Sequence, residues 1–574
     1  MKTILKTKPK HSLPIKLAMA FVFLIATAAF FFSVKYSGNN KNDVRALNLD
    51  LSILIPESAS PGGFYPKAFP VSLQAPATFK IYYTLDGSEP SLNSERYSEP
   101  LVIHDRSDES AVLAVIPTSP RWKPPVGDLF KGTVLRAICV NEADQSKSRE
   151  LISTFFIKEK KYSIPVIALT LNTSDFFGYK NGIYVMGKNY EDKRDYLRKN
   201  LPLNLSWWEY PSNYLKRGSN AERPAHIEFY ESNGTLAFEN NVGVRINGNA
   251  TRGFSQKSLR ICFDQKYGTP ELKYPLFPEC KTQTFRNFVL RNSGNDWNKT
   301  MFRDAFMQSL MEPYLDVQAY RPSLVFLNGE YWGIHNIRER SDEYYLAAKY
   351  AIPLDSLIIL EFGGDVFYGK KQDNSEFKEL LDYIRINDMT QAHNYQYIVN
   401  KIDVNSFMDF IISNVYFCNS DWPNNNVKFW RFRVAESGGD SLGARDGRWR
   451  WMLYDTDWGF GYTGPDAIQL NLLEKAKKYG SVGALFSGLL KNKEFVELFR
   501  TRFQFHLKNT FEQKALIAKI DRFESVLAPE IQEHIDRWRE IGSCSNWEKQ
   551  VQELRVFARD RPDIQLKQLD DFLK

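Results

Sequence analysis

Asp421-Trp-Pro-Asn-Asn-Asn426 and, further along the chain, Trp451-Met-Leu-Tyr-Asp-Thr-Asp-Trp-Gly-Phe-Gly461 are the two segments from which the fold and the chemistry of this sequence can be read. In the first, Asp421 and Asn426 are five residues apart. Phosphotransferases use this spacing where one loop must orient a hydroxyl nucleophile and hold a metal ion. Asp421 would orient the hydroxyl, and Asn426 would bind the metal.

The second segment places two carboxylates at the end of an apolar, aromatic run that reads as a strand. Asp455 and Asp457 come just before Gly459 and Gly461, which let the chain turn away. Carboxylates at a strand end suit Mg²⁺ binding and, through the ion, nucleotide binding. Taken alone, an Asn-rich loop is more often a simple turn.

Further segments upstream favour the catalytic interpretation over a simple turn. Together with these two segments they resemble the CotH kinase family of atypical secreted or surface protein kinases. They occur in the family's order along the chain. The segments are Val242-Gly-Val-Arg-Ile-Asn-Gly-Asn-Ala-Thr-Arg252, Gln256-Lys-Ser-Leu-Arg260, Leu290-Arg-Asn-Ser-Gly-Asn-Asp-Trp297, Phe302-Arg-Asp304, Asn328-Gly-Glu-Tyr-Trp-Gly333 and Arg338-Glu339.

The resemblance implies an ATP-dependent phosphotransferase with the following residue roles. Asp421 is the catalytic carboxylate, and the metal ligands for Mg²⁺ or Mn²⁺ are Asn426 and Asp455, with Asp457 as a further candidate. The acceptor is a protein substrate with Ser or Thr hydroxyls.

The resemblance also implies a phosphate-binding loop in the Val242–Arg260 region. Lys257 would act as a point charge on the phosphates, next to the loop 247–253. The nucleotide-binding candidates are Arg245, Gly248, Asn249, Arg252, Lys257 and Glu339. The loop differs from the commoner family form in having Asn247 where glycine is frequent, and a plain surface hairpin is the competing interpretation. Glu339 would pair with Lys257, lie near the metal, or form an ordinary salt bridge.

The amino terminus carries a targeting signal. Leu17–Val34 is an uncharged, mostly apolar run of 18 residues, and lysines precede it. This length is close to the minimum for a membrane span, and the lysines favour the cytoplasmic side. We expect residues 1–36 to anchor the chain in a membrane and 37–50 to be a linker. A cleaved signal peptide is the alternative, and either outcome places the rest of the chain in the periplasm or at the cell surface.

Charge and cysteine content exclude several classes of protein. The formal net charge is +7, but lysines before the apolar run supply most of it, and the near balance of the remainder gives no reason to expect a nucleic-acid partner. The five cysteines show no zinc-binding spacing. Cys262 and Cys280 could pair in an oxidising compartment, or all five could be free thiols.

Residues 51–158 show short alternating strands separated by turns, which indicates a small β-sandwich. The segment Tyr83-Thr-Leu-Asp-Gly-Ser-Glu-Pro90 resembles the fibronectin-III-like module at the carboxy terminus of chitobiase. Asp86-Gly87 would make a tight turn. A spacer is the favoured role for this module, and contact with polysaccharide through Tyr65, Tyr82 and Tyr83 is the other.

The predicted fold class is therefore α+β: a two-lobed, atypical kinase-like domain over 162–574, preceded by an all-β sandwich and a transmembrane helix. The first lobe is expected to be mainly β, including strands at 164–171 and 182–187 and a hairpin with a turn at Asn328-Gly329. A buried strand is expected at 357–362, a helical pattern at 407–416 precedes Asp421, and the chain is expected to be mostly helical from about 470. The predicted function is a membrane-anchored protein kinase. The alternative is a non-catalytic surface protein that binds polysaccharide or a partner protein.

Overall fold

The computed structural model describes residues 54–200, 206–434 and 440–574. The predicted membrane anchor and linker, residues 1–50, lie outside the described residues. Residues Leu51–Lys574 form one compact unit. Within the described part, no helix has both the length and the apolar character needed to cross a membrane. The mixture of strands and helices confirms the α+β class.

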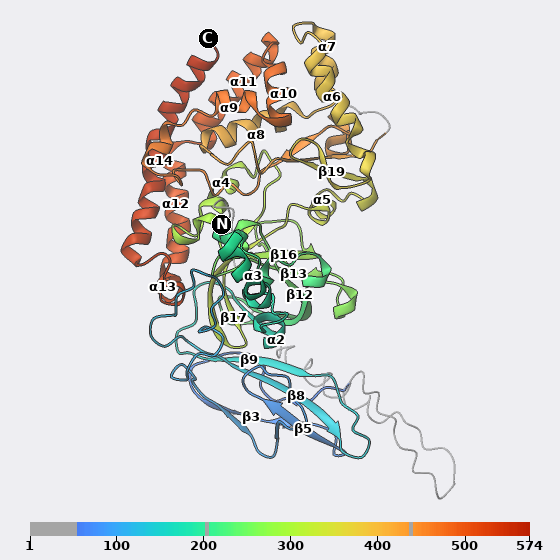
Figure 1. The fold of residues 1–574 in the computed structure, drawn as a ribbon, viewed down its shortest axis with the longest axis vertical. Coiled ribbons are helices and arrows are strands. Elements are labelled where there is room, and N and C mark those ends of the chain that lie inside the picture. Colours follow the sequence, from blue (N-terminus) through green and yellow to red (C-terminus); the bar gives the residue numbers. More distant parts are fainter. Residues whose placement is uncertain (1–53, 201–205, 435–439) are drawn as a thin grey trace, which may run out of the picture. The chain divides into compact units, whose positions relative to one another are not determined.

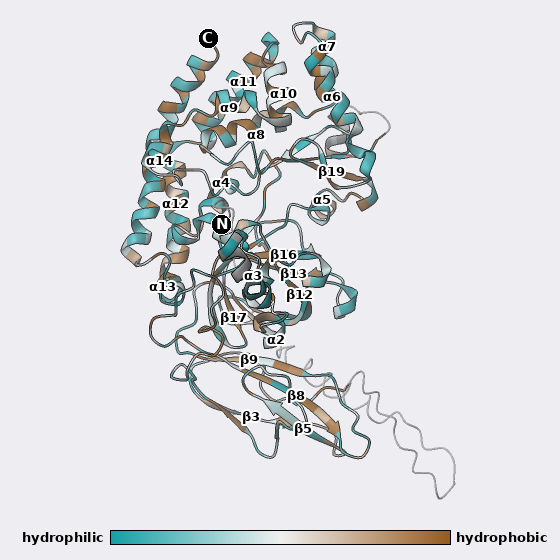
Figure 2. Cartoon of the chain, viewed as in Figure 1, coloured by the Kyte–Doolittle hydropathy of each residue, from teal (hydrophilic) through white to brown (hydrophobic). Residues whose placement is uncertain are grey.

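The first part of the chain folds into a β-sandwich. A five-stranded sheet has the order β2-β9-β8-β5-β6, and the antiparallel pair β3-β7 packs on one of its faces through Val71, Ile103, Ile81 and Leu135. Figure 2 shows the hydrophobic character of β8, whose residues are almost all buried. The strands are β1 Glu57–Ser58, β2 Gly63–Tyr65, β3 Phe69–Val71, β4 Leu73–Gln74, β5 Phe79–Thr84, β6 Glu95–Arg96, β7 Leu101–Ile103, β8 Thr133–Asn141 and β9 Leu151–Ile157.

The next part of the chain forms a closed seven-stranded barrel with the order β10-β11-β12-β13-β16-β18-β17. The strands are β10 Val166–Leu171, β11 Arg223–Tyr230, β12 Leu236–Ile246, β13 Leu259–Cys262, β16 Asn287–Arg291, β17 Tyr320–Leu327 and β18 Glu330–Arg338. A predicted Asn-Gly turn joins the last two, with Asn328 and Gly329 both at positive φ. Closure leaves no unpaired edge in the sheet, and it comes from the parallel pairing of β10 with β17.

Short elements connect the strands of the barrel and follow its last strand. They are α2 Thr173–Phe177, α3 Gly187–Asn200, β14 Leu272–Lys273, β15 Thr284–Phe285, α4 Arg303–Met311 and α5 Glu343–Tyr350. The predicted strand at 182–187 is wrong. This segment turns back on α2, where Ile183 N and Tyr184 N donate to the carbonyls of Asp175 and Phe176, so its apolar side chains are buried without joining a sheet.

Two buried glutamates join the sandwich to the barrel. Glu228 of β11 accepts hydrogen bonds from the backbone and hydroxyl of Thr154 in β9. Glu330 of β18 accepts from the backbone N–H groups of Val112, Leu113 and Ala114. Charge-assisted bonds to several donors make a carboxylate a firm anchor. The sandwich is thus attached to the barrel by specific buried contacts.

The third part combines a small sheet with helices (Figure 1). The antiparallel sheet has the order β20-β19-β21-β22. Its strands are β19 Leu357–Glu361, β20 Asp365–Tyr368, β21 Lys428–Phe432 and β22 Arg450–Met452, and the helices within this part are α6 Ser375–Ile386, α7 Ala392–Val399 and α8 Val404–Tyr416. Nearly every residue of α8 is buried, so the helix fixes the segment that follows it.

The last part of the chain is helical, as predicted. Its helices are α9 Leu473–Lys478, α10 Gly480–Leu489, α11 Lys493–Phe505, α12 Gln513–Leu527, α13 Ile531–Trp538 and α14 Cys544–Phe572. The helix α14 packs along α12, and α13 lies against β18 of the barrel. All five cysteines are free thiols, so the Cys262–Cys280 pairing does not form here.

Candidate active site

The structure brings Asp421, Asn426 and Asp455 together. The Nδ2 of Asn426 donates to Asp421 Oδ2 at 3.0 Å and to the backbone carbonyl of Asp455 at 3.0 Å. The Nδ2 of Asn425 donates to the other carboxylate oxygen of Asp421 at 2.7 Å. One amide therefore ties the loop after α8 to the loop after β22.

Local packing explains why these loops hold their shape. Trp422 is fully buried beside the ring of Phe410 in α8, which anchors the residue after Asp421 in the core. Asn426 and Asp455 both have positive φ, at 59° and 54°. Asn and Asp tolerate this region better than most residues, and such backbone strain is typical of functional sites. Asp421 itself is half-buried and open to solvent on one side.

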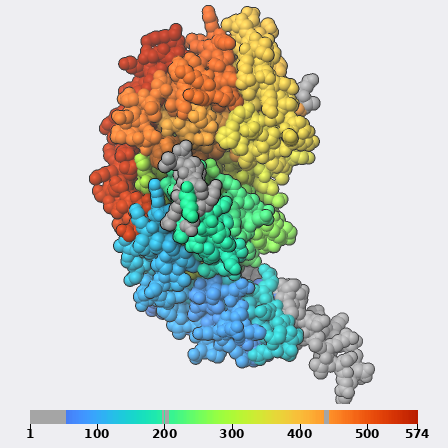
Figure 3. Space-filling view, in the orientation of Figure 1, coloured from blue at the N-terminus to red at the C-terminus, as the bar shows by residue number. Residues whose placement is uncertain are grey.

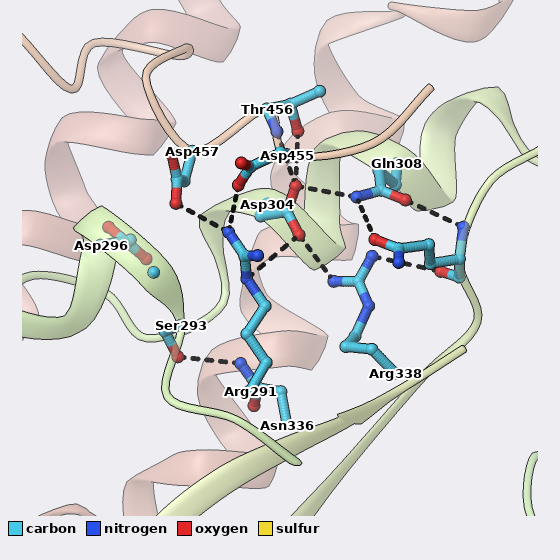
Figure 4. Close-up of polar contacts among 12 residues, drawn as sticks. Arg291, Ser293, Asp296, Asp304, Gln308, Asn336, Arg338, Asp455, Thr456 and Asp457 are labelled. Atoms are coloured by element: carbon cyan, nitrogen blue, oxygen red, sulfur yellow. Dashed lines mark hydrogen bonds and ion pairs between the residues drawn. The ribbon is translucent and has the colours of Figure 1, made fainter. Parts of the chain in front are cut away.

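Arg291 is the residue that organises the carboxylates at this site (Figure 4). It lies at the end of β16, and its Nη2 donates to Asp455 Oδ1 at 2.5 Å and to Asp457 Oδ2 at 2.8 Å. Its Nε lies 3.9 Å from Asp304 Oδ2, and Asp304 in turn pairs with Arg338 at 3.0 Å. The guanidinium group of Arg291 therefore joins the barrel to both candidate carboxylates.

The electrostatics of this cluster show an excess of negative charge around Asp457. Burial and the neighbouring carboxylate of Asp455 raise the pKa of Asp457 to about 7, although Arg291 opposes this. Burial would also raise the pKa of Asp304, but Arg338 and Arg291 hold it at about 2. The three carboxylates correspondingly raise the pKa of Arg291. Two guanidinium groups face three carboxylates here, so a cation would find a favourable potential.

The donor set fits a magnesium ion held partly by a ligand. Mg²⁺ takes hard oxygen donors and usually binds through one or two carboxylates plus phosphate oxygens and water. Asp455, with 39% of its side chain exposed, and the Oδ1 of Asn426 can supply such oxygens. No group of three or more His, Cys, Asp or Glu residues suited to a metal occurs in the described residues, so a cage made of protein alone is absent there.

Asp457 has a different environment from the one predicted for a metal ligand. Only 1% of its side chain is exposed, and it accepts hydrogen bonds from Arg291, from Asn295 N at 2.9 Å and from Asn295 Nδ2 at 3.2 Å. Its oxygens are therefore already engaged. The geometry assigns it to holding the loop, with Asp455 as the carboxylate that reaches solvent.

Lys257 is fully buried, which was not expected of a residue that contacts phosphates. Its Nζ donates to the carbonyls of Arg252 and Phe254 at 2.7 and 2.8 Å and lies 3.9 Å from the centre of the Tyr214 ring. Burial, with a smaller contribution from Arg252, holds its pKa well below the ordinary value. In this conformation the amine supports the loop 247–253, and contact with a nucleotide stays a prediction.

Arg252 supports the same loop from its other side. Its guanidinium donates to four backbone carbonyls. Gly248 lies within the loop, Ile246 ends β12 directly before it, and Tyr214 and Lys216 come from an earlier segment. Asn249 accepts from Arg217 at 2.8 Å, and Gly248 has a φ of 102°, which a residue with a side chain rarely adopts. Arg245 pairs with Glu222 at 3.8 Å. These contacts fix the loop, and none of them is a contact with Asp421 or Asp455.

Glu339 neither pairs with Lys257 nor reaches the carboxylate cluster. Its Oε2 accepts from the backbone N–H of Ala319 at 3.0 Å, and it is 8% exposed. Burial raises its pKa to about 7. In this structure Glu339 holds the backbone of Ala319, and a role at the nucleotide or the metal stays a prediction.

Arg291 is the main residue that we did not assign from the sequence. The signal that could have found it is an arginine at the end of the buried strand Asn287–Arg291, directly before the turn Asn292-Ser-Gly-Asn295. Asp304 supports Arg291 and also borders the candidate site. Its carboxylate lies 3.9 Å from Arg291 and accepts a hydrogen bond from Thr456 N at 2.8 Å. Thr456 stands between the two candidate carboxylates, Asp455 and Asp457.

The fold and the site define a class of protein. It is an α+β chain with a β-barrel part and a helical part, and its carboxylate and amide site lies on the loops after α8 and β22. Comparison with known families gives the same result. Residues 244–564, more than half of the chain, match the model described as CotH kinase protein, and residues 71–155 match the one described as Fn3 associated. The chain belongs to the CotH kinase protein family, and the resemblance read from its sequence is confirmed. No curated protein matches the chain.

Proposed function

We propose that the protein is an atypical protein kinase that transfers the γ-phosphate of ATP to a Ser or Thr hydroxyl. Family membership supports a kinase-like fold. The observation that carries the proposal is the amide of Asn426, which ties the carboxylate of Asp421 to the backbone of Asp455. A general base and a metal-binding carboxylate must be held at a fixed separation for phosphoryl transfer, and this bond fixes it.

In the proposed reaction Asp421 accepts a hydrogen bond from the acceptor hydroxyl and takes its proton as the phosphoryl group is transferred. Asn425 and Asn426 hold the carboxylate in one orientation by donating to each of its oxygens. Asp455 and Asn426 Oδ1 would hold Mg²⁺ or Mn²⁺, which when bound neutralises charge on the phosphates. Arg291 keeps Asp455 in position from the barrel side.

The test is phosphate transfer from radiolabelled ATP to a mixture of exported proteins. Asp421→Asn and Asp455→Asn should each lower the rate by about 10²- to 10⁴-fold, the range for removing a general base. Asp563→Asn, on the exposed face of α14, is the matched control and should leave the rate unchanged. Equal rates for all three variants would refute the assignment.

One observation favours a second function, a surface protein without catalysis that binds polysaccharide or a partner protein. Arg291 already compensates Asp455 and Asp457, so these carboxylates can be stable without a metal ion. Calorimetry with Mg-ATP and with a panel of glycans separates the two functions. Heat from the glycans combined with none from Mg-ATP would support the binding protein.

The cellular setting is part of the proposal. The apolar run Leu17–Val34 after several lysines supports a membrane anchor with the remaining chain in the periplasm or at the cell surface. Protease added to intact cells would then degrade the chain if it lies at the surface. Protection in intact cells with degradation after opening the outer envelope would indicate the periplasm, and protection until the inner membrane is broken would contradict the proposal.

A further inference from the structure

A hollow of about 630 Å³ lies between α6 and the pair α9 and α10, on the helical part of the chain. The yellow and orange segments that contain these helices meet on the face shown in Figure 3. Leu381 and Ile384 of α6 line the hollow. Gly488 lets α10 approach α6 closely, because a Cβ at this position would lie 2.4 Å from Ile384 Cγ1.

The rim of the hollow is basic. Arg385, Lys477, Lys478 and Lys491 line it, and its lining, which lies within the described residues, contains no Asp or Glu. Arg385 pairs with Asp382 outside the hollow at 3.0 Å, and both side chains are more than half exposed. Such an exposed ion pair is weak, so it leaves Arg385 available to a ligand.

The lysines of the rim are similarly available. Lys477 pairs with Glu474 at 3.2 Å on the exposed surface. Lys478 and Lys491 are exposed and form no salt bridge within the described part of the chain. Asp388 interacts electrostatically with Lys491, but this carboxylate is exposed, so solvent screens the interaction. The rim therefore presents a field of positive charge to solvent.

The shape of the hollow suits a polypeptide better than a small anion. A small anion is held where several donors converge in an enclosed site. Here the cations are spread around an open rim, and Leu381, Ile384 and Ala484 provide apolar surface between them. Distributed charge with apolar patches matches an extended segment that carries several Asp or Glu side chains.

The hollow is also connected to the proposed catalytic loop. Lys475 lies on α9, next to the helical turn that carries Lys477 and Lys478, and its Nζ donates to the carbonyl of Ser420 at 2.7 Å. Ser420 directly precedes Asp421. A segment bound over the rim is thereby anchored on the helix that braces the catalytic loop.

We infer that this hollow binds an acidic stretch of the protein substrate and so holds the substrate near the catalytic loop. The inference rests on the proposed kinase function for its biological meaning, but binding itself can be measured without catalysis. It identifies the acceptor as a protein with a cluster of Asp and Glu residues outside the phosphorylated position.

The test measures binding of a fluorescent peptide that contains one serine and a run of aspartates. The protein is the full chain with the Asp421→Asn substitution, so that no transfer occurs. The variant Lys478→Glu/Lys491→Glu should weaken binding by about tenfold or more at low salt, because two attractive charges become repulsive. The matched control is Lys549→Glu/Lys567→Glu, which reverses two exposed charges on α14 and should bind like the parent. A peptide with asparagines in place of the aspartates should not bind.

The outcomes separate this inference from the proposed function. If Lys478→Glu/Lys491→Glu loses binding and the control double variant does not, the hollow is supported as the binding site for the peptide. This holds even if wild-type protein fails to phosphorylate the peptide. Equal binding by both double variants overturns it, even if transfer occurs. Competition by inorganic phosphate at a concentration similar to that of the peptide would also overturn it, because the hollow would then be a site for a small anion.

Discussion

Arg291 Nη2 donates to both Asp455 and Asp457, at 2.5 and 2.8 Å. Arg291 is the last residue of the barrel strand β16. The two aspartates follow β22 of the small sheet, more than 160 positions later in the chain. The side chain of Arg291 thus helps to connect the two parts of the kinase-like region at the point where the chemistry is expected.

The first prediction follows from this contact. Arg291→Met should lower the free energy of unfolding by about 3–5 kcal/mol, because it leaves Asp457 buried without its cation and Asp304 with Arg338 alone. Denaturant unfolding measures the loss. The double variant Arg291→Met/Asp457→Asn should recover part of it, since one uncompensated charge is then removed. Arg385→Met removes a solvent-exposed pair and should have an effect of less than about 1 kcal/mol. A similar loss in Arg291→Met and Arg385→Met would contradict the role given to Arg291.

The second prediction separates the two candidate metal-binding aspartates. Asp455→Asn should remove the increase in ATP affinity that Mg²⁺ produces, because it removes the proposed metal ligand. The melting temperature should change little, because this side chain is 39% exposed. Asp457→Asn should lower the melting temperature and preserve the effect of Mg²⁺, because this side chain is 1% exposed and bonded to Arg291 and Asn295. Magnesium titrations at fixed ATP, followed by calorimetry, provide the comparison. The reverse pattern would make Asp457 the ligand.

The elements that sequence reasoning predicted are those decided by nearby residues. The Asn328-Gly329 turn, the strand at Leu357 and the helix that ends before Asp421 each depend on side chains within a few positions. The joining of Asp421 to Asn426 is local too, because both belong to one short loop. These signals depend on spacing and on backbone preference, which the sequence contains directly.

The features that it missed are decided by residues far apart in the chain. Closure of the barrel requires Val166 to pair with Leu324, and no local pattern specifies that partner. The burial of Lys257 was missed in the same way. It depends on the rings of Tyr184 and Tyr214, which come from segments far before the loop. A charged residue reads as solvent-exposed until the aromatic rings that cover it are known.

The third prediction tests whether Lys257 is a structural residue. Lys257→Met keeps much of the buried volume but leaves the carbonyls of Arg252 and Phe254 without their donor. We expect a loss of stability of about 1–3 kcal/mol per unsatisfied group, with the Kd for Mg-ATP unchanged in protein that remains folded. Chemical denaturation and calorimetry on the same samples give both numbers. A large increase in Kd without a loss of stability would restore Lys257 to the nucleotide site.

The last prediction concerns pH and rests on Glu339. Burial raises the pKa of this carboxyl from 4.5 to about 7, so the folded protein retains a proton that the unfolded chain has lost. The free energy of unfolding should therefore fall as the pH rises from 4.5 to about 7, by on the order of 3 kcal/mol in total.

Glu339→Gln keeps an oxygen to accept from Ala319 N and has no proton to lose. Relative to wild type, this variant should thus gain stability across the same interval and keep the gain above it. Denaturant unfolding of both proteins at a series of pH values follows the difference. Glu497→Gln, on the exposed side of α11, is the matched control for replacing a carboxyl by an amide. If the curves for wild type and Glu339→Gln remain parallel across this range, Glu339 is ionised in the folded protein and the barrel tolerates its charge.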